Sequence, residues 1–132
     1  MQINKGEQMV KKGDWGDKIK TASPLELVII AYEGAINFLK EADRHMNNKE
    51  HRKAGLSIVK ARKIIQELRG ALDTDVEEIS GNLFSLYRTM DAMLMRAAAD
   101  KDSQRIEQVI KMLSSLKESW AGISDLPAAK AR

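Results

Sequence analysis

The sequence predicts an all-α fold, an antiparallel up-down-up-down four-helix bundle with a flexible N-terminal arm. In four successive runs, apolar residues recur at alternating intervals of three and four, which keeps them on one face of a helix. The breaks between the runs are short and contain residues typical of helix starts, and short connections make neighbouring helices antiparallel. The chain has two prolines and no run of strand-like alternation, which disfavours a sheet.

The chain divides into three parts along its 132 residues, a length that fits one domain. Residues 1–20 are polar, contain three glycines and show no periodicity, so we expect a flexible arm. Residues 21–124 contain the four periodic runs and form the bundle. Residues 125–132 (DLPAAKAR) are predicted to be a loose C-terminal tail.

The first helix has a well-defined predicted start. Ser23 is placed to cap it, with Pro24 at the first helical position and Glu26 completing a capping box. Ile36 widens the apolar seam of this helix, whereas Ile30 is predicted to point away from it. The seam consists of Leu25, Val28, Tyr32, Ala35, Leu39, Ala42 and Met46.

The three later helices repeat this pattern. Their seams are Ala54, Ile58, Ala61, Ile65, Leu68 and Leu72; then Ile79, Leu83, Leu86, Met90, Met93 and Ala97; then Ile106, Val109, Leu113, Leu116, Trp120 and Ile123. The predicted boundaries are Asn47 with Glu50 before the second helix, Thr74 with Glu77 before the third, Asp102 or Ser103 at the fourth, and Gly122 followed by Pro127 at its end.

Charge and composition narrow the function classes. The net charge is +3, with a basic second helix and an acidic third, a distribution that favours attraction between neighbouring helices. The basic helix has no aromatic residue, so nucleic-acid binding is not expected. No apolar run is long enough to insert in a membrane, and the N-terminus is not a signal peptide, so we expect a cytoplasmic protein.

No catalytic, cofactor or metal site is predicted. The chain has no Cys, no Glu with a His three residues later, and no phosphate-binding or nucleophile-elbow motif. One alternative is a helical phosphotransfer or regulatory domain that uses His51, which is followed by basic residues and Gly55. Lys53 is two positions after His51, about 200° around the helix, so this signal is weak. No enzyme is expected.

Several apolar residues exceed what the seams require. Leu56 and Val59 stand among lysines in the second helix, and Met95 lies outside the seam of the third. Contiguous apolar residues of this kind favour a partner, and an amphipathic helix laid in a groove is the expected type. The predicted partner contacts are Leu56, Val59, Ile64, Phe84, Tyr87, Leu94 and Met95. A structural bundle that self-associates as a homodimer through the same residues is a further alternative.

The stretch TASPLELVIIAYEGAINFL resembles the opening signature of the FliS-type flagellin export chaperones. That signature runs Thr-Ala-Ser-Pro, a leucine-rich turn, Leu-Tyr-Asp/Glu-Gly-Ala and Phe-Leu, and it is matched here by Tyr32, Glu33 and Gly34. Weaker similarities occur in KARKIIQEL, Asn82-Leu83, Leu86-Tyr87 and Trp120. The resemblance extends over residues 19–123, with Ala31 where the family usually has Leu and without the tyrosines usual in the arm.

The resemblance implies a cytoplasmic four-helix bundle that acts without bond chemistry. Members of this family bind the C-terminal segment of flagellin, prevent its premature polymerisation and deliver it to the flagellar type III export gate. The implied partners are therefore the flagellin C-terminal segment and the export gate. In the family, the N-terminal arm is held to cover the binding groove until the client displaces it.

Overall fold

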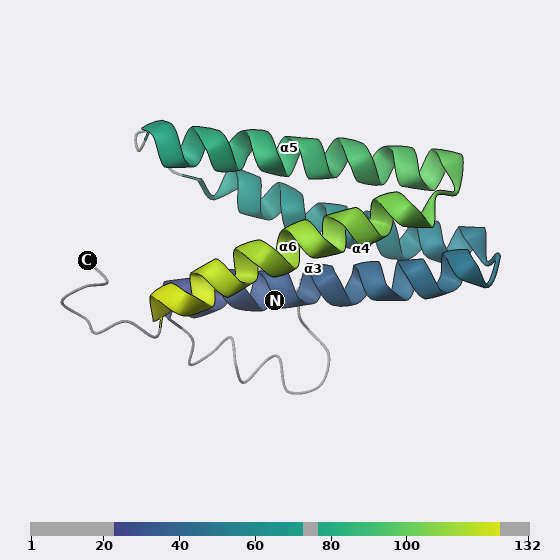
Figure 1. Ribbon diagram of the computed structural model, residues 1–132, viewed down its shortest axis with the longest axis horizontal. Coiled ribbons are helices and arrows are strands. Elements are labelled where there is room, and N and C mark those ends of the chain that lie inside the picture. The colour runs from purple at the N-terminus through teal and green to yellow at the C-terminus, as the bar shows by residue number, and fades with distance from the viewer. Residues whose placement is uncertain (1–22, 73–76, 125–132) are drawn as a thin grey trace, which may run out of the picture.

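The computed structural model describes residues 23–72 and 77–124, which form four helices arranged as a bundle (Figure 1). The helices, labelled as in Figure 1, are α3 (Pro24–Asn47), α4 (His51–Gly70), α5 (Glu77–Asp100) and α6 (Ser103–Ser124). The predicted all-α four-helix bundle is therefore confirmed. The predicted arm and tail lie outside the described residues.

The four helices form a closed ring around one core. Helix α3 packs against α4 and α6, and α5 packs against the same two helices. Helices α3 and α5 therefore face each other diagonally across the core, as Figure 1 shows with α4 and α6 between them. A contact between side chains of α3 and α5 therefore lies inside the bundle.

The predicted start of α3 is confirmed. The Ser23 hydroxyl oxygen accepts a hydrogen bond from the Glu26 backbone N–H at 3.2 Å, and the Glu26 carboxylate accepts one from the Ser23 N–H at 3.2 Å. Pro24 occupies the first turn, where its missing N–H costs nothing. The capping box satisfies two backbone donors that the helix itself leaves without partners.

Both described corners of the bundle are Schellman turns closed by a lysine. Lys49 and Lys101 have φ of 59° and 54°, the left-handed conformation that reverses the chain after a helix. After α3, the Glu50 N–H donates to the His45 carbonyl at 2.8 Å, and after α5 the Asp102 N–H donates to the Ala97 carbonyl at 3.0 Å. These bonds satisfy carbonyls at the ends of α3 and α5 and keep the connections short.

Of the other predicted helix boundaries, one is confirmed and two are wrong. Asp102 caps α6, because its carboxylate accepts a hydrogen bond from the Gln104 N–H at 3.0 Å. The capping box of Asn47 with Glu50 is wrong: α3 continues through Asn47, and Glu50 occupies the N-cap of α4 without a side-chain cap bond. Gly122 does not end α6, which continues to Ser124. Thr74 lies outside the described residues.

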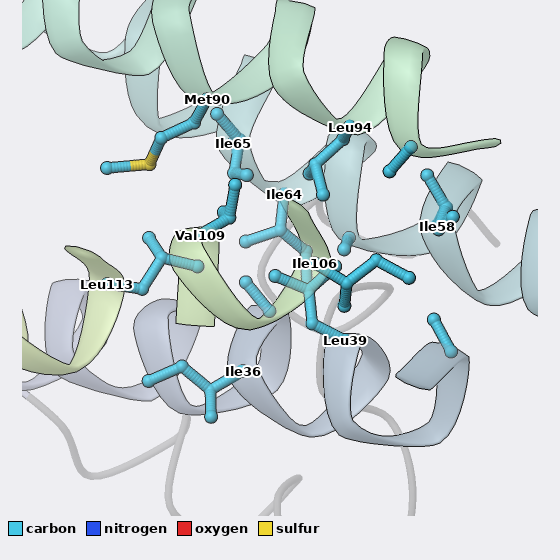
Figure 2. Close-up of a cluster of buried hydrophobic side chains, with 14 of the residues drawn as sticks. Ile36, Leu39, Ile58, Ile64, Ile65, Met90, Leu94, Ile106, Val109 and Leu113 are labelled. Atoms are coloured by element: carbon cyan, nitrogen blue, oxygen red, sulfur yellow. The ribbon is translucent and has the colours of Figure 1, made fainter. Parts of the chain in front are cut away.

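Aliphatic side chains from all four helices fill the core. Figure 2 shows them pointing toward one another: Ile36, Leu39, Ile58, Ile64, Ile65, Met90, Leu94, Ile106, Val109 and Leu113. Full burial of one such side chain contributes about 1.5–3 kcal/mol. Ile30 departs from the sequence interpretation, because it is buried although it lies off the seam. The buried face of α3 is therefore wider than its seam.

Candidate partner-binding surface

Four of the seven predicted partner contacts are exposed on α4 and α5. Leu56 and Val59 of α4 are 57% and 46% exposed, and Met95 and Phe84 of α5 are 53% and 39% exposed. They are four of the six large hydrophobic side chains that are exposed in the part of the chain that the structure describes. We call these four residues the α4–α5 face.

The other three predicted contacts are core residues. Ile64, Tyr87 and Leu94 are at most 2% exposed. They face the interior because the helical period turns them away from the exposed positions of the same helices. A partner on the closed bundle does not reach them, so the prediction that they lie on a surface is corrected.

Two contacts between α4 and α5 fix the register of the α4–α5 face. The Arg62 guanidinium donates to both Asp91 carboxylate oxygens, at 2.8 and 3.4 Å, and the Gln66 amide donates to the same carboxylate at 3.4 Å. Seven residues further along α4, the Arg69 guanidinium lies 5.7 Å from the centre of the Phe84 ring, seven residues earlier in α5. The same antiparallel register therefore holds over two turns.

This register places the four apolar residues at the two ends of a shared surface. Val59 is level with Met95, and Phe84 lies about 16 Å further along, from 11 residues at about 1.5 Å each. The Arg62–Asp91 pair lies between these ends, and it is half-buried. An ion pair in this position holds the two helices side by side, so the α4–α5 face keeps its shape.

Apart from Glu67, one turn after Lys63 on α4, and Asp91, the charges beside the α4–α5 face are positive. Arg52, Lys63 and Arg88 are exposed, and among the described residues none of them forms an ion pair. The acidic Asp91 is already bound to Arg62. The surface that remains is apolar at its ends and positively charged along its sides.

The residues that match the family signature hold α3 in the bundle. Tyr32 is fully buried, Gly34 is buried, and the Glu33 carboxylate pairs with the Lys117 ammonium of α6 at 3.4 Å. Their positions make them structural supports, and they do not lie on the α4–α5 face. A glycine in mid-helix costs about 1 kcal/mol relative to Ala, and Gly34 bears this cost on the buried side of α3.

Tyr32 meets Tyr87 across the bundle. Their hydroxyls share a buried hydrogen bond, and the rings meet edge to face with centroids 6.4 Å apart. Burial raises the pKa of both hydroxyls. Either hydroxyl can be the donor in this bond. This is the polar centre of an otherwise aliphatic core.

The indole nitrogen of Trp120 in α6 completes this cluster. It is buried and has no well-formed hydrogen bond among the described residues, but it is close enough to the Tyr32 hydroxyl to lower its pKa. An indole N–H only donates, so the Tyr32 oxygen is the atom that faces it as an acceptor, while the Tyr32 hydroxyl also shares its bond with Tyr87. The cluster ties α3, α5 and α6 together.

The two histidines are engaged at the α3–α4 corner. His45 Nδ1 lies 3.0 Å from the Glu50 carboxylate, and His51 Nδ1 lies 3.3 Å from the Met46 sulfur. Lys53, which follows His51 by two positions, pairs with Glu50 at 3.3 Å. Both histidine rings and the Lys53 ammonium therefore have partners at this corner.

The described part of the chain has neither a metal-binding cluster nor a membrane-spanning helix. Over residues 23–72 and 77–124, no three acidic or histidine side chains come together as a metal would need. None of the four helices is both long and apolar enough to cross a bilayer. Leu27 and Ile123 are also exposed, near the start of α3 and the end of α6, where fewer neighbours cover a helix. The prediction that Ile123 belongs to the buried seam is therefore wrong.

The comparisons with known proteins agree with one another. A family model described as "Flagellar protein FliS" matches residues 7–127. The flagellar secretion chaperone FliSB of Pseudomonas aeruginosa is 33% identical over 108 residues, which cover 81% of this chain and 86% of the relative. The flagellar secretion chaperones FliS of Escherichia coli and Bacillus subtilis are 28% identical over 122 residues and 26% over 104, covering 91% and 79% of this chain and 90% and 77% of the relatives.

Proposed function

Because the chain belongs to the FliS family of flagellar proteins, we propose that it is a cytoplasmic chaperone for the C-terminal helical segment of flagellin. It binds that segment before export, prevents its premature polymerisation and delivers it to the flagellar type III export gate. The names of the relatives, flagellar secretion chaperones, support this proposal. The masking of an adhesive surface requires no bond chemistry, so no catalytic group is assigned.

The observation that carries the proposal is the α4–α5 face. A chaperone for an amphipathic helix needs apolar side chains that stay exposed when its own core is complete. Leu56, Val59 and Met95 meet this requirement, because each is about half exposed while the core beneath them is closed. A segment that orders only on binding gains its affinity by covering such side chains over a long stretch.

Calorimetric titration with the C-terminal segment of the cognate flagellin tests the proposal. We expect binding at micromolar concentrations or better, and about tenfold weaker binding after Val59→Ser with Met95→Ser, since each loses buried apolar area. The matched control is Leu27→Ser with Ile123→Ser, two apolar residues of similar exposure on α3 and α6. No binding at micromolar concentrations would rule out the proposed function.

A further inference from the structure

The charged residues that border the α4–α5 face indicate which kind of segment binds there. The register of α4 against α5 places Lys63 level with Met90, and Arg88 level with Ile65, so the two cations lie on opposite sides of the same stretch. Lys63 follows Arg62 and turns outward from the core, and Arg88 precedes Asp91 by three residues and also turns outward. Both side chains are exposed.

Most of the other cations on these two helices have a partner. Arg62 is bound by Asp91, Arg69 lies over Phe84, Lys60 lies over Phe38 at 5.6 Å, and Arg96 is 3.9 Å from Asp100. Lys63 and Arg88 have no such contact among the described residues. A segment laid between the apolar ends of the face passes between two cations that have no ion pair among residues 23–72 and 81–123, with Glu67 one turn after Lys63.

We propose that the segment bound on the α4–α5 face is an acidic amphipathic helix, with carboxylates that border its apolar stripe and pair with Lys63 and Arg88. Its apolar residues lie about 11 positions apart, to match the Val59–Met95 and Phe84 ends. The inference rests on the proposed function and specifies the chemistry of the client. The charges select which helix binds and speed its approach, while the apolar ends hold it.

The choice of an acidic helix as the bound segment follows from charge complementarity. A basic segment meets repulsion from Lys63, Arg88 and Arg52, and an uncharged one leaves these cations facing an apolar neighbour. A second copy of this chain would bring the same cations against each other in a two-fold contact, because such a contact uses the same patch twice. An acidic segment is the occupant that the charges favour.

Two designed peptides test the charge preference on the full chain. Both have the same helical apolar positions; one is bordered by Glu, and the other is bordered by Lys. We expect the Glu-bordered peptide to bind at least about tenfold more tightly at 50 mM salt, and the difference to shrink at 500 mM, where the screening length is shorter. Equal affinities at low salt would overturn the inference.

Charge reversal locates the effect on the chain. Lys63→Glu with Arg88→Glu is expected to weaken binding of the Glu-bordered peptide about tenfold or more. The helical content is expected to stay unchanged, because neither side chain forms an ion pair among the described residues. The matched control is Lys40→Glu with Lys111→Glu, exposed lysines of α3 and α6 without ion pairs among the described residues, which change the net charge equally. If both double variants weaken binding equally, the effect is one of net charge and the inference fails. The milder Lys63→Gln with Arg88→Gln replaces the reversal variant if that variant unfolds.

A titration with the flagellin segment separates this inference from the proposed function. If flagellin binds and is insensitive to Lys63→Glu with Arg88→Glu, the function stands and the charge pairing is wrong. If flagellin fails to bind but the Glu-bordered peptide binds selectively, the charge preference stands and the client is another protein. A dimer in sedimentation that Met95→Ser disperses would assign the face to a second copy and overturn the proposal.

Discussion

Helices α3 and α5 have the same length, 24 residues, and the same spacing of seam residues, but they bury very different shares of their surface. Helix α3 buries a wide stripe that includes Ile30 and Ile36, whereas the described part of α5 buries about one residue per turn: Tyr87, Met90, Leu94 and Ala97. The difference follows from the neighbours, because α4 and α6 pack more extensively against α3 than against α5. Apolar residues beside the seam are therefore core in α3 and surface in α5.

The largest expected effect on stability comes from truncating one core leucine in each of these two helices. Leu39 in α3 and Leu94 in α5 are both fully buried. We expect Leu39→Ala to lower the free energy of unfolding by about 3–4 kcal/mol and Leu94→Ala by about 2–3 kcal/mol, because the more loosely held α5 can move into the space. Urea unfolding followed by circular dichroism measures both. Equal costs would show that α5 is held as firmly as α3.

A smaller effect is expected at the tyrosines that join the two helices. Tyr32→Phe removes the oxygen faced by both Tyr87 and Trp120, so we expect a loss of about 2 kcal/mol. Tyr87→Phe removes one partner of the shared bond and leaves Tyr32 beside Trp120, so a loss of about 1 kcal/mol is expected. Unfolding in urea gives both values. The reverse order would mean that Trp120 does not contribute to the stability of this cluster.

The smallest effect contrasts one carboxylate on each helix. Asp91 of α5 pairs with Arg62, whereas a buried oxygen of Asp43 in α3 has no hydrogen bond among the described residues. Burial and the nearby Glu107 carboxylate raise the pKa of Asp43 above its ordinary 3.8. Folding therefore favours the protonated form, and the stability that this group contributes below about pH 3.8 is lost as the pH rises through its folded pKa.

Asparagine substitutions at these two positions are expected to have opposite signs at pH 7. Asp43→Asn is expected to stabilise the fold by about 0.5 kcal/mol, by removal of the like charge, and to give less gain at pH 3.5. Asp91→Asn is expected to destabilise it by about 1 kcal/mol, by removal of the Arg62 partner. Thermal melts at the two pH values measure these changes. A gain for Asp43→Asn that does not depend on pH would point to packing as its cause.

The sequence predicts the fold well because the relevant signals are local. The seam spacing and the start at Ser23 depend on residues within a few positions of each other. The start is confirmed, and the described seam residues lie in or against the core except for Leu25 and Ile123. The Asn47 boundary failed because Lys49 takes a left-handed conformation, which a sequence seldom signals at lysine. The Gly122 boundary failed because one glycine does not end a helix by itself.

The candidate surface was only half predictable for a different reason. Exposure of Val59 and Met95 agrees with the helical wheel, but burial of Ile64 and Leu94 depends on how closely α4 and α5 approach their neighbours. The meeting of Tyr32 with Tyr87, 55 positions apart, depends on which helices lie diagonally, and spacing within one helix does not encode that.

Because Trp120 lies where three helices meet, its fluorescence reports whether the bundle is closed. The chain has two tryptophans, so Trp15→Phe leaves a single indole, at the meeting point of α3, α5 and α6. Far-ultraviolet circular dichroism measures helical content and does not report whether the helices stay packed together. The emission of Trp120 does, because water that enters between α3 and α5 shifts it to longer wavelength. A client that rests on the closed bundle leaves that emission unchanged, and one that reaches Ile64 or Leu94 by parting the helices shifts it.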